Sequence, residues 1–189
     1  MRVISRDGVA RATTRGIVAE AGSSTAALHY SFTDKEELFE EVVAHCQRLT
    51  LTHFRERHPE NDDLAHAVRT LFRMFVEWAR GGAEFHVAQY ELFFWGRRTS
   101  PARSFAADIY AGYIALCEQI LADALQDDDP VLVSRLAKDV MAIADGLVLQ
   151  VLAFGDKGPT DEDIERYSRL ILSDVRPAVE RRRGTDSAA

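Results

Sequence analysis

The chain has 189 residues, of which 47% are hydrophobic and 28% are charged, as in an ordinary folded protein. This length can bury a sizeable core in one or two domains. The two cysteines exclude a disulfide scaffold and a four-cysteine zinc site. No apolar run approaches the roughly 18 residues of a membrane helix and no secretory signal opens the chain, so we expect a cytoplasmic protein.

The net charge of −7 argues against a nucleic-acid partner, but the charge is unevenly distributed. Residues 1–35 hold five basic and three acidic side chains, a local charge of +2. The remainder of the chain therefore carries −9. The sequence describes a small cationic N-terminal segment followed by a large acidic one.

Residues 13–32 read TTRGIVAEAGSSTAALHYSF and predict two short helices joined by a glycine turn. Thr13 can cap the first helix, Gly22 can end it in a left-handed turn, and Ser24 can cap the second. In such a helix-turn-helix the second helix enters the major groove of DNA. A third helix from Asp34 would support the pair through three apolar side chains: Leu38, Val42 and Val43.

The outer face of the second predicted helix carries small, hydroxyl and aromatic side chains and no Lys or Glu. Such residues permit a close approach to base edges, whereas a merely solvated face would carry charges. Arg15 can reach a phosphate or a guanine, and Lys35 can reach a phosphate. The pattern alone leaves a second interpretation open, because helix–glycine–helix segments also occur in helical proteins that bind no DNA. The residues of this face are Thr25, Ala26, Ala27, His29, Tyr30 and Ser31.

This stretch resembles the DNA-binding domain of TetR-family transcriptional regulators, in the form T-T-R-x-I-x-x-x-A-G-x-S-x-x-x-L-x-Y-x-F-x-x-K-E-x-L. The resemblance implies a helix-turn-helix domain over residues 1–45, which we call the head, with Thr14 and Ser24 added to the DNA contacts. It also implies a helical body that binds a small ligand and dimerises. The matching residues are Thr13, Thr14, Arg15, Ile17, Ala21, Gly22, Ser24, Leu28, Tyr30, Phe32, Lys35, Glu36 and Leu38.

Two features depart from the family pattern. The first helix is usually longer than the segment Met1–Arg6 that precedes Asp7 and Gly8 here, so we expect a truncated first helix and leave open whether the native N-terminus lies upstream of Met1. Ser23 and Val18 occupy positions that usually hold valine and alanine. These two residues predict a head that is packed differently or more loosely.

The body, residues 46–180, has helical periodicity and no strand pattern. Apolar side chains recur every three or four positions in residues 64–79, 105–125, 131–154 and 161–180, with Pro or Gly between them. A long helix from Lys35 to about Arg55 would join head and body. We predict an all-α protein whose polar residues 181–189 form a flexible tail.

The last two body helices suit a dimer interface. Residues 131–154 carry two adjacent apolar stripes, which predict a helix buried on two sides. Paired with residues 161–180 of each subunit, it would form a four-helix bundle across a two-fold axis. The alternative is that both stripes pack within one subunit. The predicted interface residues are Leu136, Val140, Ile143, Leu147, Val151, Ile164, Tyr167 and Ile171.

The middle of the body concentrates aromatic side chains with a few polar groups among them. This mixture is typical of a small-molecule pocket, although an aromatic stripe is often plain core. We expect an apolar or aromatic effector whose binding shifts the dimer away from its operator-binding geometry. The candidate ligand residues are Phe75, Trp78, His86, Tyr90, Phe94, Tyr113, Cys117, Met141 and Asp145.

An enzyme is the rival class. The six histidines form no H-E-x-x-H zinc pattern, and no phosphate loop or nucleophile elbow occurs. We predict no catalytic residue, metal or cofactor. The predicted function is a ligand-responsive DNA-binding regulator, a repressor that a small molecule releases from double-stranded operator DNA. The alternative is a helical protein-interaction module without sequence-specific DNA binding.

Overall fold

The computed structural model describes residues 1–57, 63–99, 105–125 and 129–186. The described residues are almost entirely helical and contain no strand, which confirms the all-α prediction. They divide into two compact units, Met1–Glu56 with Gly81–Gly112 and Arg57–Arg80 with Tyr113–Ala189. We describe the two units separately.

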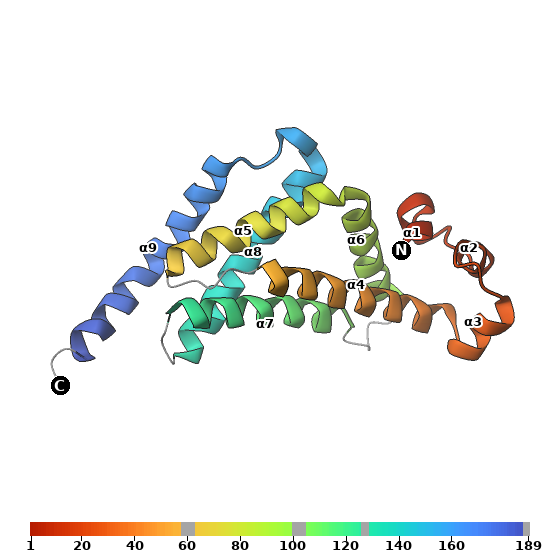
Figure 1. Ribbon diagram of the computed structural model, residues 1–189, viewed down its shortest axis with the longest axis horizontal. Coiled ribbons are helices and arrows are strands. Elements are labelled where there is room, and N and C mark those ends of the chain that lie inside the picture. The colour runs from red at the N-terminus through yellow and green to blue at the C-terminus, as the bar shows by residue number, and fades with distance from the viewer. Residues whose placement is uncertain (58–62, 100–104, 126–128, 187–189) are drawn as a thin grey trace. The chain divides into compact units, whose positions relative to one another are not determined.

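The first unit opens with three short helices that lead into a long one (Figure 1). As predicted, Thr13 and Ser24 cap the second and third helices, since their hydroxyl oxygens accept hydrogen bonds from the amides of Gly16 and Ala27, each at 3.1 Å. Gly22 has a φ of 61°, the left-handed conformation that the pattern predicted. The helices of this unit are α1 (Arg2–Asp7), α2 (Thr14–Glu20), α3 (Thr25–Ser31), α4 (Lys35–Arg57), α6 (Ala83–Thr99) and the first part of α7 (Phe105–Leu125).

A single apolar cluster holds the first unit together. It joins α1 and the turn after it to α4 and α6, and partly buried side chains of α2 and α3 pack on its edge. The helix predicted from Asp34 is the start of the 23-residue α4, and its predicted apolar side chains pack in the cluster. The buried members are Val3, Ile4, Val9, Ala12, Leu38, Phe39, Val43, Ala88 and Leu92.

The second unit contains most of α5 (Leu64–Gly81), the rest of α7, α8 (Pro130–Phe154), the 3-10 turn η1 (Gly155–Lys157) and α9 (Asp161–Asp186). The predicted stripe of α5 is buried, since Val68, Leu71 and Phe72 are fully enclosed. Asp129 caps α8 by accepting hydrogen bonds from the amides of Val131 and Leu132.

Two predicted boundaries differ from the observed helices. α9 runs to Asp186, so residues 181–186 are helical, whereas the pattern ended the helix at residue 180. α4 passes without a break through residue 45, where the head was predicted to end. The division into a DNA-binding head and an effector-binding body stays a prediction.

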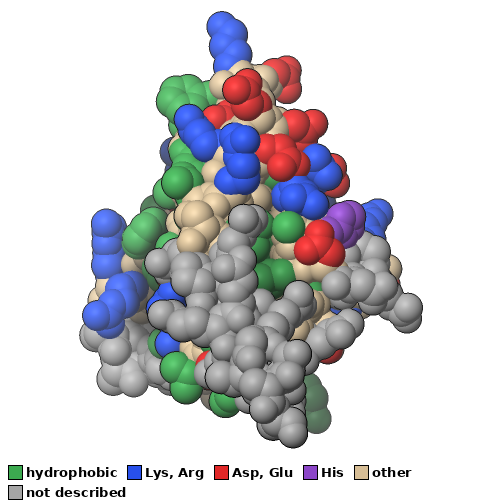
Figure 2. Space-filling view, turned by 90° about the vertical axis from the view of Figure 1, so that its left-hand side faces the viewer, with side chains coloured by type: hydrophobic (Ala, Val, Ile, Leu, Met, Phe, Trp, Pro, Cys, Tyr) green, Lys and Arg blue, Asp and Glu red, His purple; other side chains and the backbone are tan. Residues whose placement is uncertain are grey.

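Charged side chains join two helices of the second unit. The guanidinium groups of Arg69 and Arg73 on α5 lie within 4 Å of the carboxylates of Glu165 and Asp161 on α9. On the described part of the face that Figure 2 shows, basic and acidic side chains lie next to one another. Since both signs mix on this face, it is not a basic surface of the kind that binds phosphates.

The two neighbouring serines before α3 give a matched test of its cap. Ser24→Ala removes the hydroxyl that holds the Ala27 amide and should cost about 1 kcal/mol of helix stability. We expect the amides of α3 to exchange with deuterium roughly fivefold faster. Ser23→Ala is the control, because no hydrogen bond of the Ser23 hydroxyl is among those of the described residues. Equal exchange in both variants would contradict the assigned cap.

Candidate nucleic-acid interface

The outer face of α3 is exposed and uncharged. Thr25, Ala26, Ala27, His29, Tyr30 and Ser31 are all exposed, and Tyr30 retains 94% of its accessible surface. Leu28 and Phe32 instead pack against the apolar cluster, so α3 is held by one side only. A phenol that stands in water on a short helix makes no contribution to the core. The arrangement leaves hydroxyls, methyls and an imidazole free to meet a partner.

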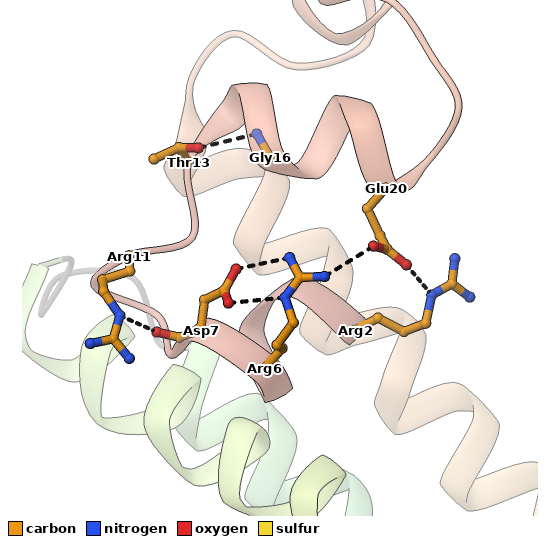
Figure 3. Close-up of polar contacts among 7 residues, drawn as sticks. All are labelled: Arg2, Arg6, Asp7, Arg11, Thr13, Gly16 and Glu20. Carbon is orange, nitrogen blue, oxygen red and sulfur yellow. Dashed lines mark hydrogen bonds and ion pairs between the residues drawn. The ribbon is translucent and has the colours of Figure 1, made fainter.

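Two of the basic side chains counted in the N-terminal segment are committed to internal ion pairs (Figure 3). Arg2 Nε lies 2.6 Å from Glu20 Oε1, and Arg6 contacts both Asp7, at 2.9 Å, and Glu20, at 3.4 Å. These hydrogen-bonded guanidinium groups lower the pKa of Asp7 and Glu20. Arg11 donates to the backbone oxygen of Asp7 at 2.9 Å. The network connects α1 to α2. Because Glu20 and Asp7 balance the charges of Arg2 and Arg6, these two arginines add little positive charge for binding phosphates.

Two other cations of this segment, Arg15 and Lys35, are in no ion pair among the described residues. Arg15, in the first turn of α2, is exposed and forms no ion pair with a described residue. The Lys35 ammonium group lies 4.9 Å from the centre of the Phe39 ring, at the start of α4. Sequence reasoning weighed the five basic residues by position alone and missed this difference, because the partner of Arg2 is 18 residues away.

The first unit contains a link that sequence reasoning missed. The amide of Val9, in the turn between α1 and α2, donates to Glu91 Oε2 on α6 at 2.8 Å. The Phe39 ring on α4 and the Trp95 ring on α6 meet edge to face, with centroids 5.0 Å apart. The first contact joins residues 82 positions apart, so no local pattern could have revealed it.

The candidate effector residues are divided between the two units. Phe75, Trp78, Tyr113, Cys117, Met141 and Asp145 belong to the second unit, and His86, Tyr90 and Phe94 belong to the first. The structure brings Phe75 and Tyr113 together, with ring centroids 6.3 Å apart. His86 is buried, whereas Phe94 is 56% exposed. A cavity of about 610 Å³ in the first unit, beside Met1, Phe39 and Cys46, includes none of these nine residues.

Burial perturbs two ionisable groups among these candidates. It raises the pKa of the Asp145 carboxyl to about 6, and no ion pair to Asp145 occurs among the described residues. It raises the pKa of the Cys117 thiol to about 12, which keeps the sulfur protonated and poorly nucleophilic. Near neutral pH, Asp145 is therefore the group of the two that can carry a negative charge and pair with a cation.

Most of the predicted interface residues are already buried within the single chain. Leu136, Val140, Leu147, Val151, Ile164 and Ile171 are at most 7% exposed, and only Ile143 and Tyr167 are half-buried. These six side chains therefore pack within the subunit, and their part in a dimer interface stays a prediction.

Two kinds of feature are absent from the described ranges of the chain. Within them, no group of three or more His, Cys, Asp or Glu residues could hold a metal ion. No described helix is long and apolar enough to cross a membrane.

Comparison with known proteins identifies the chain at both ends. Residues 1–42 match the family model of bacterial regulatory proteins of the tetR family, and residues 59–181 match the model described as the Tetracyclin repressor-like C-terminal domain. The chain belongs to the TetR family. It is 30% identical over 159 residues to the HTH-type nicotine-responsive transcriptional repressor HdnoR of Paenarthrobacter nicotinovorans, covering 81% of this chain and 79% of that protein.

A solved structure is similar over almost the whole chain. The crystal structure of the multidrug binding protein EbrR complexed with imidazole has 25% sequence identity and a TM-score of 0.66, covering 90% of this chain and 88% of that one. With the family models, these relatives show that this TetR-family member is a ligand-responsive transcriptional repressor and not an enzyme. TetR-family repressors bind operator DNA and small-molecule effectors and work as dimers. None of the comparisons supports an interaction module without DNA binding.

Proposed function

We propose that α3 reads the operator and that Arg15 and Lys35 hold the phosphate backbone beside it. The exposed, uncharged face of α3 carries this assignment, because its side chains are small enough to approach base edges. The Thr14 and Ser24 positions at the starts of α2 and α3 add backbone amides that can donate to phosphates. A cytoplasmic location, where the operator would be reached, stays a prediction.

The proposed dimer surface is an exposed small-residue face of α8. Ala142, Leu149 and Ala153 are exposed, Gly146 is half-buried, and these four follow one side of the helix at spacings of four, three and four residues. A Cβ at Gly146 would meet no described atom within 4 Å, so the space beside it is open. On α9, Leu170 adds an exposed apolar side chain. Small side chains allow two copies of α8 to approach closely across a two-fold axis.

The proposed effector is a small aromatic nitrogen base. The Phe75–Tyr113 ring pair offers apolar surface, and Asp145 on α8 offers a partly buried carboxyl that no described cation neutralises. A protonated amine would relieve the unfavourable burial of that carboxylate. The names of the two relatives support this class, since nicotine and imidazole are both basic nitrogen heterocycles.

Alanine variants of Arg15 and Arg2 distinguish a side chain that contacts DNA from one that serves the fold. Arg15→Ala should lower affinity for DNA from upstream of the protein's own gene and reduce the salt slope by about 1 per subunit, because each lost phosphate contact releases fewer counterions. Arg2→Ala should leave the slope unchanged, since its guanidinium is paired with Glu20. Tyr30→Ala should weaken operator binding by about 1–3 kcal/mol with no change in slope. Gel shifts at several salt concentrations measure all three, and equal slopes for both arginine variants would disprove the assignment.

The oligomeric state tests the proposed face of α8. Leu149→Glu places a charge on the exposed small-residue face and should convert the dimer to a species of 21.2 kDa in light scattering. Phe154→Glu changes another exposed apolar side chain, outside the set of Ala142, Gly146, Leu149 and Ala153, and should leave the dimer intact. If Leu149→Glu stays dimeric at micromolar concentration, the interface lies elsewhere.

Asp145→Asn tests the charge partner of the effector. With nicotine and imidazole as probes, wild-type affinity should rise as pH increases through about 6, because the carboxyl ionises there. The variant should lose that rise.

Asp145→Asn should also change the pH dependence of stability. Because the pKa of Asp145 is raised in the folded state, the wild type loses stability as pH rises from about 4 to 6. The variant should therefore have a higher melting temperature than the wild type at pH 7 but not at pH 4. Calorimetry measures both, and a variant that binds like the wild type at pH 7 would remove Asp145 from the site.

A further inference from the structure

One hydrogen bond connects the turn after α1 to the middle of α6. Val9 N donates to Glu91 Oε2 at 2.8 Å, and the atoms belong to the same compact unit. The acceptor is a carboxylate, and hydrogen bonds to charged acceptors are stronger than those between neutral groups. The contact lies beside α1 and α2, the two helices that precede the DNA-reading helix.

The backbone conformation of Gly8 permits this bond. Gly8 has a φ of 79°, a conformation that side chains with a Cβ rarely adopt. A Cβ at this position would lie 3.3 Å from Glu91 Oε2, closer than an ordinary contact. The glycine therefore allows both the turn of the chain at the end of α1 and the approach of the carboxylate to the Val9 amide.

The apolar contacts around the bond give stability but not direction. Val9, Ala88 and Leu92 are buried in the same cluster, and hydrophobic burial tolerates small rotations of one element on another. A hydrogen bond weakens steeply when its distance or angle changes. The Glu91 bond is thus a directional contact between the turn after α1 and α6.

We propose that Glu91 is a positioning residue for operator binding. By holding the Val9 amide it fixes α1 and the start of α2 against α6, and so sets the orientation in which the exposed face of α3 is presented. The inference rests on the proposed reading of the operator by α3. A head held loosely on α6 still meets phosphates but meets base edges less often, so the residue acts on specificity more than on total DNA affinity.

The test compares three variants of the full-length protein. Glu91→Ala removes the acceptor, Glu91→Gln keeps an acceptor oxygen without the charge, and Glu84→Ala removes a carboxylate from the exposed first turn of the same helix. Each is titrated with DNA from upstream of the protein's own gene and with a shuffled fragment of equal length and composition. Hydrogen exchange of the Val9 amide and the melting temperature are measured on the same samples.

The expected result is a loss of discrimination. Glu91→Ala should lower affinity for the upstream DNA about tenfold, leave affinity for the shuffled DNA within about twofold, and speed exchange at Val9. Glu91→Gln should recover most of the discrimination, and Glu84→Ala should behave as the wild type. The melting temperature should change little, because Glu91 is exposed and does not belong to the apolar cluster.

Three outcomes would overturn the proposal, and they differ from one another. Unchanged affinities for both DNAs in Glu91→Ala would show that the bond does not position the head. An equal loss for both DNAs together with a lower melting temperature would show a structural role alone. If the wild type itself fails to distinguish upstream from shuffled DNA, then the reading of the operator by α3 fails, and the positioning role fails with it.

Discussion

The two short helices of this repressor's helix-turn-helix, α2 and α3, are too short to be stable by themselves. α2 and α3 have seven residues each and contain no fully buried side chain, and helices of that length are marginal in water. Their stability comes from caps at Thr13 and Ser24 and from the apolar cluster that α1, α4 and α6 supply. The constraint on the whole head is therefore a shared core. Any change in how α6 packs is also a change in the support of α3.

The ion pairs of the head also support its short helices. Arg2 and Arg6 neutralise Glu20 and Asp7 and so connect α1 with α2, which the short helices need. Residues 1–35 carry a net charge of +2, but two of their five basic side chains, Arg2 and Arg6, are in ion pairs with Glu20 and Asp7. In the proposed mode of binding, DNA affinity depends on a few cations per subunit and on the pairing of two subunits, since two heads would engage two half-sites together.

Much of the fold could be predicted from the sequence, because the relevant signals are local. Thr13, Gly22 and Ser24 are a cap, a left-handed turn and a second cap, and each acts within three residues of itself. Helical periodicity likewise located α5, α7, α8 and α9 closely at their starts. What could not be predicted are contacts between distant residues, such as Glu91 with Val9 and Glu20 with Arg2.

The candidate interface shows the same limit in a different way. Two apolar stripes on α8 predicted two buried sides, and the structure buries both inside one chain. A hydrophobic pattern reports burial but not the identity of the partner that provides it. The exposed face with Ala142, Gly146 and Leu149 carries a weak hydrophobic signal, because Ala142 and Gly146 are small and only Leu149 is a large apolar residue. Close approach of helices selects for small side chains, which a search for large apolar residues passes over.

α6 carries residues of two kinds: members of the apolar cluster that supports the head, and candidate effector residues. Ala88, Leu92 and Trp95 belong to one face, which packs in the cluster beneath the head, and Glu91 on the edge of that face holds the Val9 amide. His86 and Tyr90, two candidate effector residues, fall on the opposite side of the helical wheel, since residues two positions from Ala88 lie about 160° away around the axis. A helix transmits displacement as a rigid body, because its backbone hydrogen bonds resist bending within a few turns. Under the proposed function, an effector that engages the His86 side would act on the head by moving α6, and the proposed role of the Glu91 bond is to pass that movement on to α3.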